Sequence, residues 1–270
     1  MLSIADYFGY DLPYPERYRL IARAGFGAVM LWYGDDFGQQ FRAENRPAQA
    51  RTRGLAIENV HAPFHEVNHI WEGTAEGQRV FEGYLRCVDD CARYKIPTIV
   101  MHADRGRSPP PVSEQGLERF GQLIGRAQRR GVNIAVENLR NAQQIDRAGL
   151  LLERFDSPRL GYCFDSGHWH ARYQDFDWLA RWPQRLMALH LHDNHGGEIE
   201  GHDDQHLLPF DGTMDWPALM AALAATGYRG PTTLELARKV GYKLCTRRRF
   251  LAQAYERAKQ LAQLRKEALL

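Results

Sequence analysis

The 270-residue sequence lacks the features that mark several classes of protein. Its four cysteines are too few to cross-link a chain of this length. No apolar run approaches the 18 residues that a membrane-spanning helix requires. The 35 Lys and Arg residues nearly balance the 33 Asp and Glu residues, whereas binding through nucleic-acid phosphates calls for a basic excess. Residues 1–6 show no secretory leader pattern. We therefore expect a cytoplasmic protein with no membrane or nucleic-acid partner.

The chain also lacks a glycine-rich phosphate loop of the kind that opens a doubly wound nucleotide-binding sheet. Instead, helical patterns alternate with eight short β-type runs: Leu2–Ala5, Ala28–Trp32, Ile57–His61, Thr98–His102, Val132–Glu137, Leu160–Asp165, Met187–His192 and Thr232–Leu236. The clearest helical patterns cover residues 15–24, 75–94, 113–130, 215–227 and 244–269. This alternation predicts an α/β fold, a (β/α)8 TIM barrel, as a single domain over residues 1–270.

Ionisable side chains stand at or just after the ends of the predicted strands. Enzyme sites in such barrels lie at the carboxyl ends of the strands, where these groups would meet. They are His61, His102, Glu137, Asp165, His168, His190 and Glu235, with Asp204 and His206 in a loop after the seventh strand. Burying so many ionisable groups together is costly unless a counter-charge neutralises them. Imidazole and carboxylate are suitable ligands for a divalent cation, so the pattern predicts a metal site.

Several motifs in chain order resemble one known family, the xylose isomerase-like barrels, which include sugar phosphate isomerases and epimerases and the related endonuclease IV enzymes. The matching segments are Val60-His61-Ala62-Pro63-Phe64, Val100-Met101-His102, Ala135-Val136-Glu137-Asn138-Leu139, Phe164-Asp165-Ser166-Gly167-His168, Leu189-His190-Leu191-His192-Asp193-Asn194, Asp204-Gln205-His206-Leu207-Leu208-Pro209-Phe210-Asp211-Gly212 and Thr233-Leu234-Glu235. They extend over nearly the whole chain. The family contains several reactions, so the resemblance is more specific for the fold than for the chemistry.

The resemblance implies a set of metal ligands that differs between branches of the family. In the isomerase and epimerase branch, one divalent ion would be held by Glu137, Asp165, His190 and Glu235, and His168 would contact the substrate. In the endonuclease branch three zinc ions would share a larger set, to which this chain would add His61, His102, His168, Asp204 and His206. The cofactor is then one to three ions of zinc, manganese, cobalt or magnesium.

The isomerase interpretation has a direct chemical basis. Moving a carbonyl group between adjacent carbons, or inverting a carbon beside it, requires removal of a weakly acidic proton and gives an enediolate, which a divalent metal can stabilise. Two carboxylates on opposite sides can remove and return that proton. Glu137 and Glu235 belong to the fifth and eighth strands and could face each other across the barrel mouth. We therefore expect a metal-dependent sugar or sugar phosphate isomerase or epimerase with these two glutamates as acid and base.

Other residues are weaker candidates for the same site. Trp32 and Tyr33 could form a wall of the substrate pocket, and Trp71 or Trp169 could cap it. Arg105, together with Arg107, could bind the phosphate of a sugar phosphate. Asn138 and Asn194 could orient metal ligands through their amides. His192 could share the inward face of its strand with His190, because side chains alternate along a strand.

Two other functions remain open at this stage. The first is a zinc-dependent phosphodiesterase of the endonuclease IV type, although the balanced charge and the weakly basic segment after His61 argue against a DNA-repair role. The second is a non-catalytic sugar-binding barrel, in which the ionisable residues would have no role in catalysis or metal binding. The expected partner is a small sugar molecule. Loops rich in Trp and Tyr at the barrel mouth are candidate surfaces for a homo-oligomer.

Overall fold

The computed structural model describes the whole chain except residues 173–176, 198–203, 239–241, 243 and 270. The strands within the described residues are β1 (Leu2–Ala5), β2 (Ala28–Trp32), β3 (Ala56–His61), β4 (Thr98–Met101), β5 (Asn133–Glu137), β6 (Leu160–Asp165), β7 (Leu186–His190) and β8 (Thr232–Leu234). The helices are α1 (Tyr14–Ala24), α2 (Gln39–Ala43), α3 (Arg46–Arg51), α4 (Ala75–Arg93), α5 (Glu114–Arg130), α6 (Ala142–Arg154), α7 (Ser166–Arg172), α8 (Trp178–Arg181), α9 (Trp216–Ala225) and α10 (Arg247–Glu267), with short 3-10 turns at Val67–Trp71 and Pro183–Arg185.

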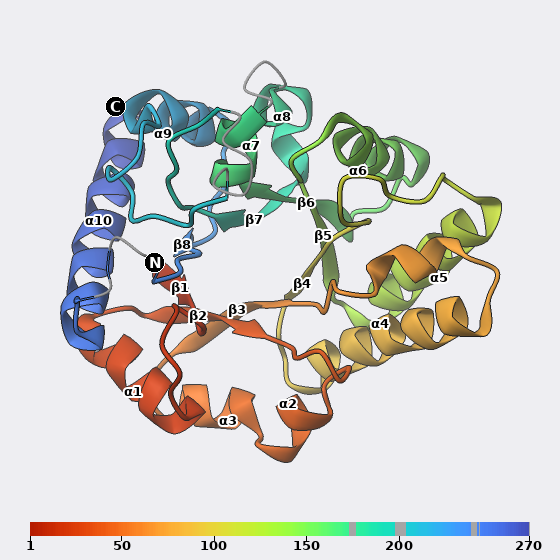
Figure 1. Cartoon of the computed structure of the whole chain (residues 1–270), viewed down its shortest axis with the longest axis horizontal. Coiled ribbons are helices and arrows are strands. Elements are labelled where there is room, and N and C mark those ends of the chain that lie inside the picture. The colour runs from red at the N-terminus through yellow and green to blue at the C-terminus, as the bar shows by residue number, and fades with distance from the viewer. Residues whose placement is uncertain (173–176, 198–203, 239–241, 243, 270) are drawn as a thin grey trace.

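The strands form one parallel sheet that closes on itself. Their order is β7-β6-β5-β4-β3-β2-β1-β8, and every pair is parallel. The ring closes between β7 and β8 at a bridge between Leu191 and Leu234. There the Leu191 amide donates to the Thr233 carbonyl at 2.9 Å. Figure 1 shows the helices surrounding the strands, which confirms the predicted (β/α)8 barrel.

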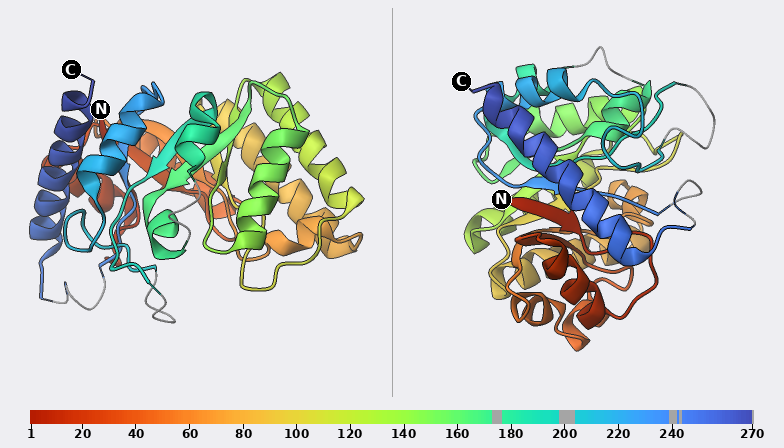
Figure 2. Two further views of the ribbon diagram at one scale, coloured as in Figure 1. Left: turned by 90° about the horizontal axis from the view of Figure 1, so that it is seen from above. Right: turned by 90° about the vertical axis from the view of Figure 1, so that its left-hand side faces the viewer.

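Local sequence signals explain where the main helices begin. The side chains of Thr74, Ser113, Asp215 and Thr246 each accept a hydrogen bond from a backbone amide in the first turn of α4, α5, α9 and α10. α1 ends at Gly25, whose left-handed φ of 110° suits glycine. α6 begins at a similar cap, Asn141, but no clear helical pattern in the sequence predicted this helix. The last helix, α10, packs against α1, α9 and β8 (Figure 2).

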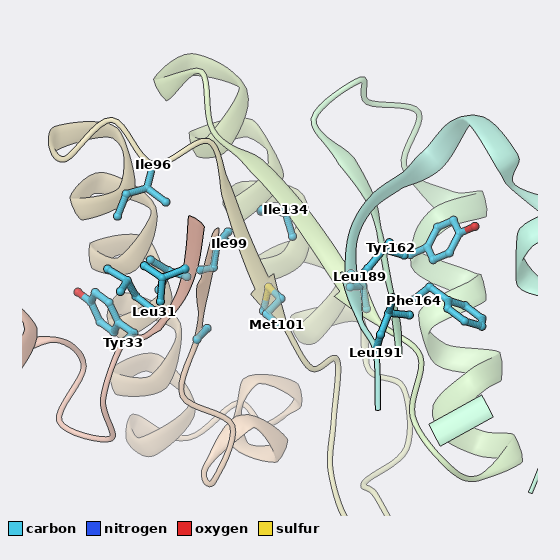
Figure 3. Close-up of a cluster of buried hydrophobic side chains, with 14 of the residues drawn as sticks. Leu31, Tyr33, Ile96, Ile99, Met101, Ile134, Tyr162, Phe164, Leu189 and Leu191 are labelled. Atoms are coloured by element: carbon cyan, nitrogen blue, oxygen red, sulfur yellow. The ribbon is translucent and has the colours of Figure 1, made fainter. Parts of the chain in front are cut away.

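The apolar side chains form two layers, one outside the sheet and one inside the barrel. The outer layer packs strands against helices and includes Ile99, Met101, Ile134, Phe164, Leu189 and Leu191 (Figure 3). The inner layer is smaller and consists of Val100, Ala135, Cys163 and Ala188. Because side chains alternate along a strand, the residues two positions after the inner layer also face the barrel interior. Those residues are His102, Glu137, Asp165 and His190.

None of the helices in the described ranges combines the length and the apolar composition of a membrane-spanning segment.

Candidate active site

Four ionisable side chains meet at the carboxyl ends of adjacent strands. Glu137, Asp165 and His190 are the last residues of β5, β6 and β7, and Glu235 follows β8 directly. One potential ligand atom from each lies within 4.8 Å of all the others. The first three side chains are buried, and that of Glu235 is 19% exposed. The structure thus brings together the four residues that the family resemblance singles out as ligands of one ion.

His190 lies between the two glutamates. Its Nδ1 is 3.4 Å from Glu137 Oε2 and 3.5 Å from Glu235 Oε2. The ring is fully buried, yet neither ring nitrogen has a partner in hydrogen-bond geometry among the described residues. Burial alone would lower the pKa of this imidazole, but Cys163 and the two carboxylates raise it well above its usual range. A buried imidazole without a hydrogen bond, set between carboxylates, fits a divalent metal site.

Glu137 is surrounded by imidazole rings. Its carboxylate oxygens lie 3.2 Å from a ring nitrogen of His61, 3.4 Å from one of His102 and 3.2 Å from one of His168. Within the described part of the chain, its ion pairs are all with histidines. Burial raises the pKa of Glu137, but His190, His102 and His168 together outweigh burial and hold it well below its usual range. The carboxylate is therefore ionised, which is the state that binds a cation or accepts a proton.

Asp165 is held in place by several hydrogen bonds. His192 Nε2 lies 3.1 Å from both of its carboxylate oxygens, and the His168 amide donates to Oδ1 at 2.7 Å. Asn138 fixes the backbone at the same point, because its amide group donates to the Asp165 carbonyl and accepts from the Asp165 amide. Burial raises the pKa of Asp165, but His168 and His192 outweigh burial and lower the pKa below its usual value. The carboxylate is therefore ionised.

The remaining predicted ligands extend the same network. His206 Nε2 lies 3.0 Å from Asp204 Oδ1, and His168 Nε2 lies 3.8 Å from Asp204 Oδ2. Burial lowers the pKa of His206, but Asp204 raises it to about 9. Three further groups bring possible ligand atoms within 4.8 Å of one another: His61–His102–Glu137, His61–His190–Glu235 and His192–His206–Glu235. All nine residues predicted as metal ligands therefore lie in one continuous cluster.

The structure settles which residues of the seventh strand region face the cluster. His190 and His192 both point inward, and the His192 ring stacks on His206 with centroids 4.0 Å apart. Asp193 faces the opposite side, where its carboxylate accepts a hydrogen bond from Trp216 Nε1 at 2.8 Å. His192 therefore belongs to the cluster, although in the sequence it was a weaker candidate than His190.

One candidate was wrongly placed, and one residue was missed. Trp71 does not cap the mouth, because its indole is buried against Phe120 and donates to the Ala103 carbonyl.

Asp6 was missed, although it directly follows β1 just as the other site residues end or follow their strands. Its Oδ2 accepts a hydrogen bond from Tyr18 at 3.1 Å, and burial raises the pKa of its carboxyl group.

Two cavities open beside the cluster, on different sides of it. The first, of about 440 Å³, is lined by residues at or after the ends of β1, β2 and β8, including Asp6, Tyr7, Tyr14, Trp32 and Glu235, and by His206 from the loop after β7. The second, of about 320 Å³, is lined by residues that follow β3 to β7, including Phe64, His102, Arg105, Arg140, His168 and Asp204. Of the predicted substrate-binding residues, Trp32 thus lines the first cavity, whereas Arg105 and His168 line the second.

Comparisons with known proteins agree with this architecture. A family model described as xylose isomerase-like TIM barrel matches residues 18–265. An uncharacterized protein from Sinorhizobium fredii is 35% identical over 159 residues, which cover 55% of this chain and 50% of that protein. An inosose isomerase from Bacillus velezensis is 26% identical over 139 residues, which cover 49% of this chain and 50% of that protein. The chain thus spans about half the length of these two relatives.

Solved structures with the same fold include sugar epimerases. A D-psicose 3-epimerase from Clostridium cellulolyticum H10 superposes with a TM-score of 0.72 at 14% identity, covering 100% of this chain and 99% of that one. The IolI protein, described with a zinc atom, superposes with a TM-score of 0.73 at 15% identity, covering 98% of each chain. At these identities the likeness shows the fold.

Proposed function

Because this chain belongs to the xylose isomerase-like TIM barrel family, we propose that it is a metal-dependent isomerase or epimerase of a small sugar. The observation that carries the proposal is the convergence of Glu137, Asp165, His190 and Glu235 at the barrel mouth. The sugar epimerase and inosose isomerase among its relatives and structural neighbours support the same reaction class.

These four residues would hold the ion. Three carboxylates and one imidazole form a donor set that suits zinc, manganese, cobalt or magnesium. When bound, the cation would supply positive charge to offset the negative charge that develops on the substrate oxygens. Asn138 and His192 would keep Asp165 in position through the hydrogen bonds described above.

The two glutamates would transfer the proton. Glu235 lines the larger cavity directly, whereas Glu137 is in contact with His102 and His168, which line the smaller one. A sugar lying between the cavities would present its reacting carbon to both carboxylates. One glutamate would remove the proton beside the carbonyl group, and the other would return a proton to the resulting enediolate. His168 would hold a substrate hydroxyl group through its ring.

Exchange of the substrate proton with solvent tests this role. The protein loaded with Mn²⁺ would be incubated with ketoses in D₂O, and deuterium at the reacting carbon would be measured by mass spectrometry. We expect Glu137→Gln and Glu235→Gln each to reduce incorporation by about 100-fold or more, the usual contribution of a positioned acid or base. Glu82→Gln, an exposed change on α4, is the matched control. Normal incorporation in both active-site variants would rule out the two-glutamate mechanism.

One observation favours a second candidate function. Additional ions could be held by two further groups, each of which shares one glutamate with the four-residue set. These groups are His61–His102–Glu137 and His192–His206–Glu235. Several zinc ions at one mouth can supply a hydroxide that attacks a phosphodiester. Zinc-loaded protein would therefore be incubated with a DNA duplex that contains an abasic site. Strand cleavage at enzymatic rates, lost in His206→Ala, would favour the phosphodiesterase over the isomerase.

A further inference from the structure

The described residues that line the smaller cavity beside Glu137 are rich in arginine. Three arginines line it: Arg105 and Arg107 from the loop after β4, and Arg140 from the loop after β5. Asp204 is the one acidic residue among the described lining residues. That carboxylate lies 3.0 Å from His206 Nε2 and 4.0 Å from Arg140 Nη1, so histidine and arginine already share its charge. The described lining residues therefore include three arginines against one carboxylate, a composition that favours an anionic ligand.

Arg105 is held in position at this cavity. Its backbone amide donates to Asn68 Oδ1 at 2.8 Å, and its carbonyl accepts from Asn68 Nδ2 at 3.1 Å. The guanidinium donates to the His65 carbonyl at 2.9 Å and lies 5.8 Å from the centre of the Phe64 ring. A guanidinium has five N–H donors in a planar fork that matches the oxygens of a phosphate or a carboxylate. Because these bonds fix the Arg105 backbone, the guanidinium loses less conformational entropy when it binds an anion.

A helix terminus adds to the positive potential. Asn141 caps the 13-residue helix α6, and both Asn141 and Gln144 from its first turn line the cavity. Asn141 Nδ2 also donates to the Gly106 carbonyl at 3.0 Å, which ties the arginine-bearing loop to the start of the helix. The amino end of a helix carries partial positive charge and favours anions.

The same cavity shares a wall with the proposed reaction centre. His102 and His168 line it, and each has a ring nitrogen within 3.4 Å of a Glu137 carboxylate oxygen. We propose that this cavity binds an anionic substituent of the substrate, a phosphate ester or a carboxylate, and that the sugar is therefore an acidic one. The proposal rests on the proposed isomerase or epimerase function for its reaction. The remainder of the sugar would extend toward Trp32 and Tyr14 in the larger cavity.

Matched sugars test the anion preference. Pentuloses and hexuloses, their terminal phosphate esters and the matching ketouronates would be titrated into Mn²⁺-loaded protein by calorimetry. We expect at least one anionic sugar to bind about tenfold or more tightly than its neutral parent, as charge-assisted bonds to arginine predict. Tighter binding of the ester indicates phosphate, and tighter binding of the uronate indicates carboxylate.

Arginine variants identify the site of that preference. Arg105→Gln and Arg140→Gln should each reduce the anionic-to-neutral ratio of affinities and of kcat/KM by about tenfold. Arg53→Gln, an exposed change just after α3, should leave both ratios unaltered. A thermal midpoint close to that of the parent protein shows that each variant is folded. The proposal is overturned if neutral sugars bind as tightly as their anionic forms, or if the arginine variants leave the ratio unchanged.

Failure of the proposed anion site can be distinguished from failure of the proposed isomerase or epimerase function. If neutral ketoses exchange deuterium and show no anion preference, the isomerase stands and the anion site is wrong. If an anionic sugar binds through Arg105 and Arg140 but no sugar exchanges deuterium, the anion site stands and the proposed reaction is wrong.

Discussion

His192 Nε2 lies 3.1 Å from both carboxylate oxygens of Asp165, and both side chains are fully buried. The imidazole thus faces the carboxylate symmetrically and leaves it little freedom to rotate. This arrangement depends on the small residue that lies beside the ring. A Cβ placed on Gly167 would lie 1.9 Å from His192 Cε1, so the close approach of helix α7 to this ring requires glycine at that position.

Gly167→Ala should therefore disturb both stability and metal binding. The added methyl group must displace the buried His192 ring, and overpacking of this kind costs about 1–3 kcal/mol. We expect a lower urea midpoint and weaker Mn²⁺ or Zn²⁺ binding by calorimetry, because Asp165 loses its fixed position. Gly73→Ala is the control, since a Cβ there meets no atom within 4 Å. Unchanged stability and metal affinity in Gly167→Ala would contradict this account of the His192 contact.

Arg46 should be a major source of stability near the larger cavity. Its guanidinium is fully buried, and it donates to the Trp32 carbonyl at 2.9 Å, the Tyr33 carbonyl at 2.8 Å and the Tyr14 hydroxyl at 2.6 Å. Arg46→Met would leave the buried Tyr33 carbonyl and the partly buried Trp32 carbonyl and Tyr14 hydroxyl without this donor, at a cost of about 1–3 kcal/mol for a buried group that stays unsatisfied.

Urea unfolding of Arg46→Met and Arg53→Met separates this effect from a general loss of charge. Arg53 is exposed, so its replacement should change the free energy of unfolding by less than about 0.5 kcal/mol. Equal stability of the two variants would mean that the buried arginine contributes nothing specific.

Asp89 should give a pH-dependent link between α4 and α5. It accepts hydrogen bonds from Arg126 Nε at 2.8 Å and from Arg130 Nε at 2.8 Å. The Arg126 bond lowers the pKa of Asp89, burial opposes the shift, and Arg130 lowers it further. A carboxyl group with a lowered pKa in the folded state stabilises the fold above the unfolded pKa of about 3.9, and this contribution is lost as the pH falls through the folded pKa.

We therefore expect Asp89→Asn to lower the free energy of unfolding at neutral pH by about 0.5–1 kcal/mol, because these arginines are partly exposed. The difference from the parent protein should shrink in urea titrations as the pH is lowered from about 5 to about 2. Glu118→Gln, an exposed change on α5, should show no such convergence. A deficit in Asp89→Asn that persists in acid would show that packing, and not the ion pair, is responsible.

The sequence was sufficient to predict the barrel and the members of its central cluster. In the sequence, an apolar run closed by a carboxylate predicted the ends of β5 and β6. Glu137 and Asp165 lie together in the structure because these two strands are parallel neighbours. Strand alternation also correctly allowed His192 to join His190 on the inner face. The roles of these residues in catalysis and metal binding remain predictions.

Other features depended on contacts that no local pattern reports. Trp71 looks like a loop aromatic in the sequence, but α5 approaches so closely that its ring packs on Gly116 and Phe120. α6 was missed because the apolar positions between Ala142 and Arg154 are interrupted by buried polar residues, among them Gln144 and Arg147. Each cavity is lined by loops that follow several neighbouring strands of the ring, so its boundaries follow from the closed barrel and not from any single segment.

Metal titration should distinguish the proposed enzyme from a non-catalytic sugar-binding barrel. Protein stripped with a chelator should bind Mn²⁺ or Zn²⁺, and its stability should rise by about 2.7 kcal/mol when the free ion is 100-fold above its dissociation constant. Asp165→Asn and His190→Ala should lose most of this gain, because both residues belong to the four-residue group. Glu82→Gln should retain it, since that residue is exposed on α4. Elemental analysis of His206→Ala then reports the number of ions: an unchanged metal content indicates one ion held by the central group, and a loss indicates additional sites. Absence of binding in the parent protein would leave the buried carboxylates without a functional explanation and would favour the sugar-binding barrel.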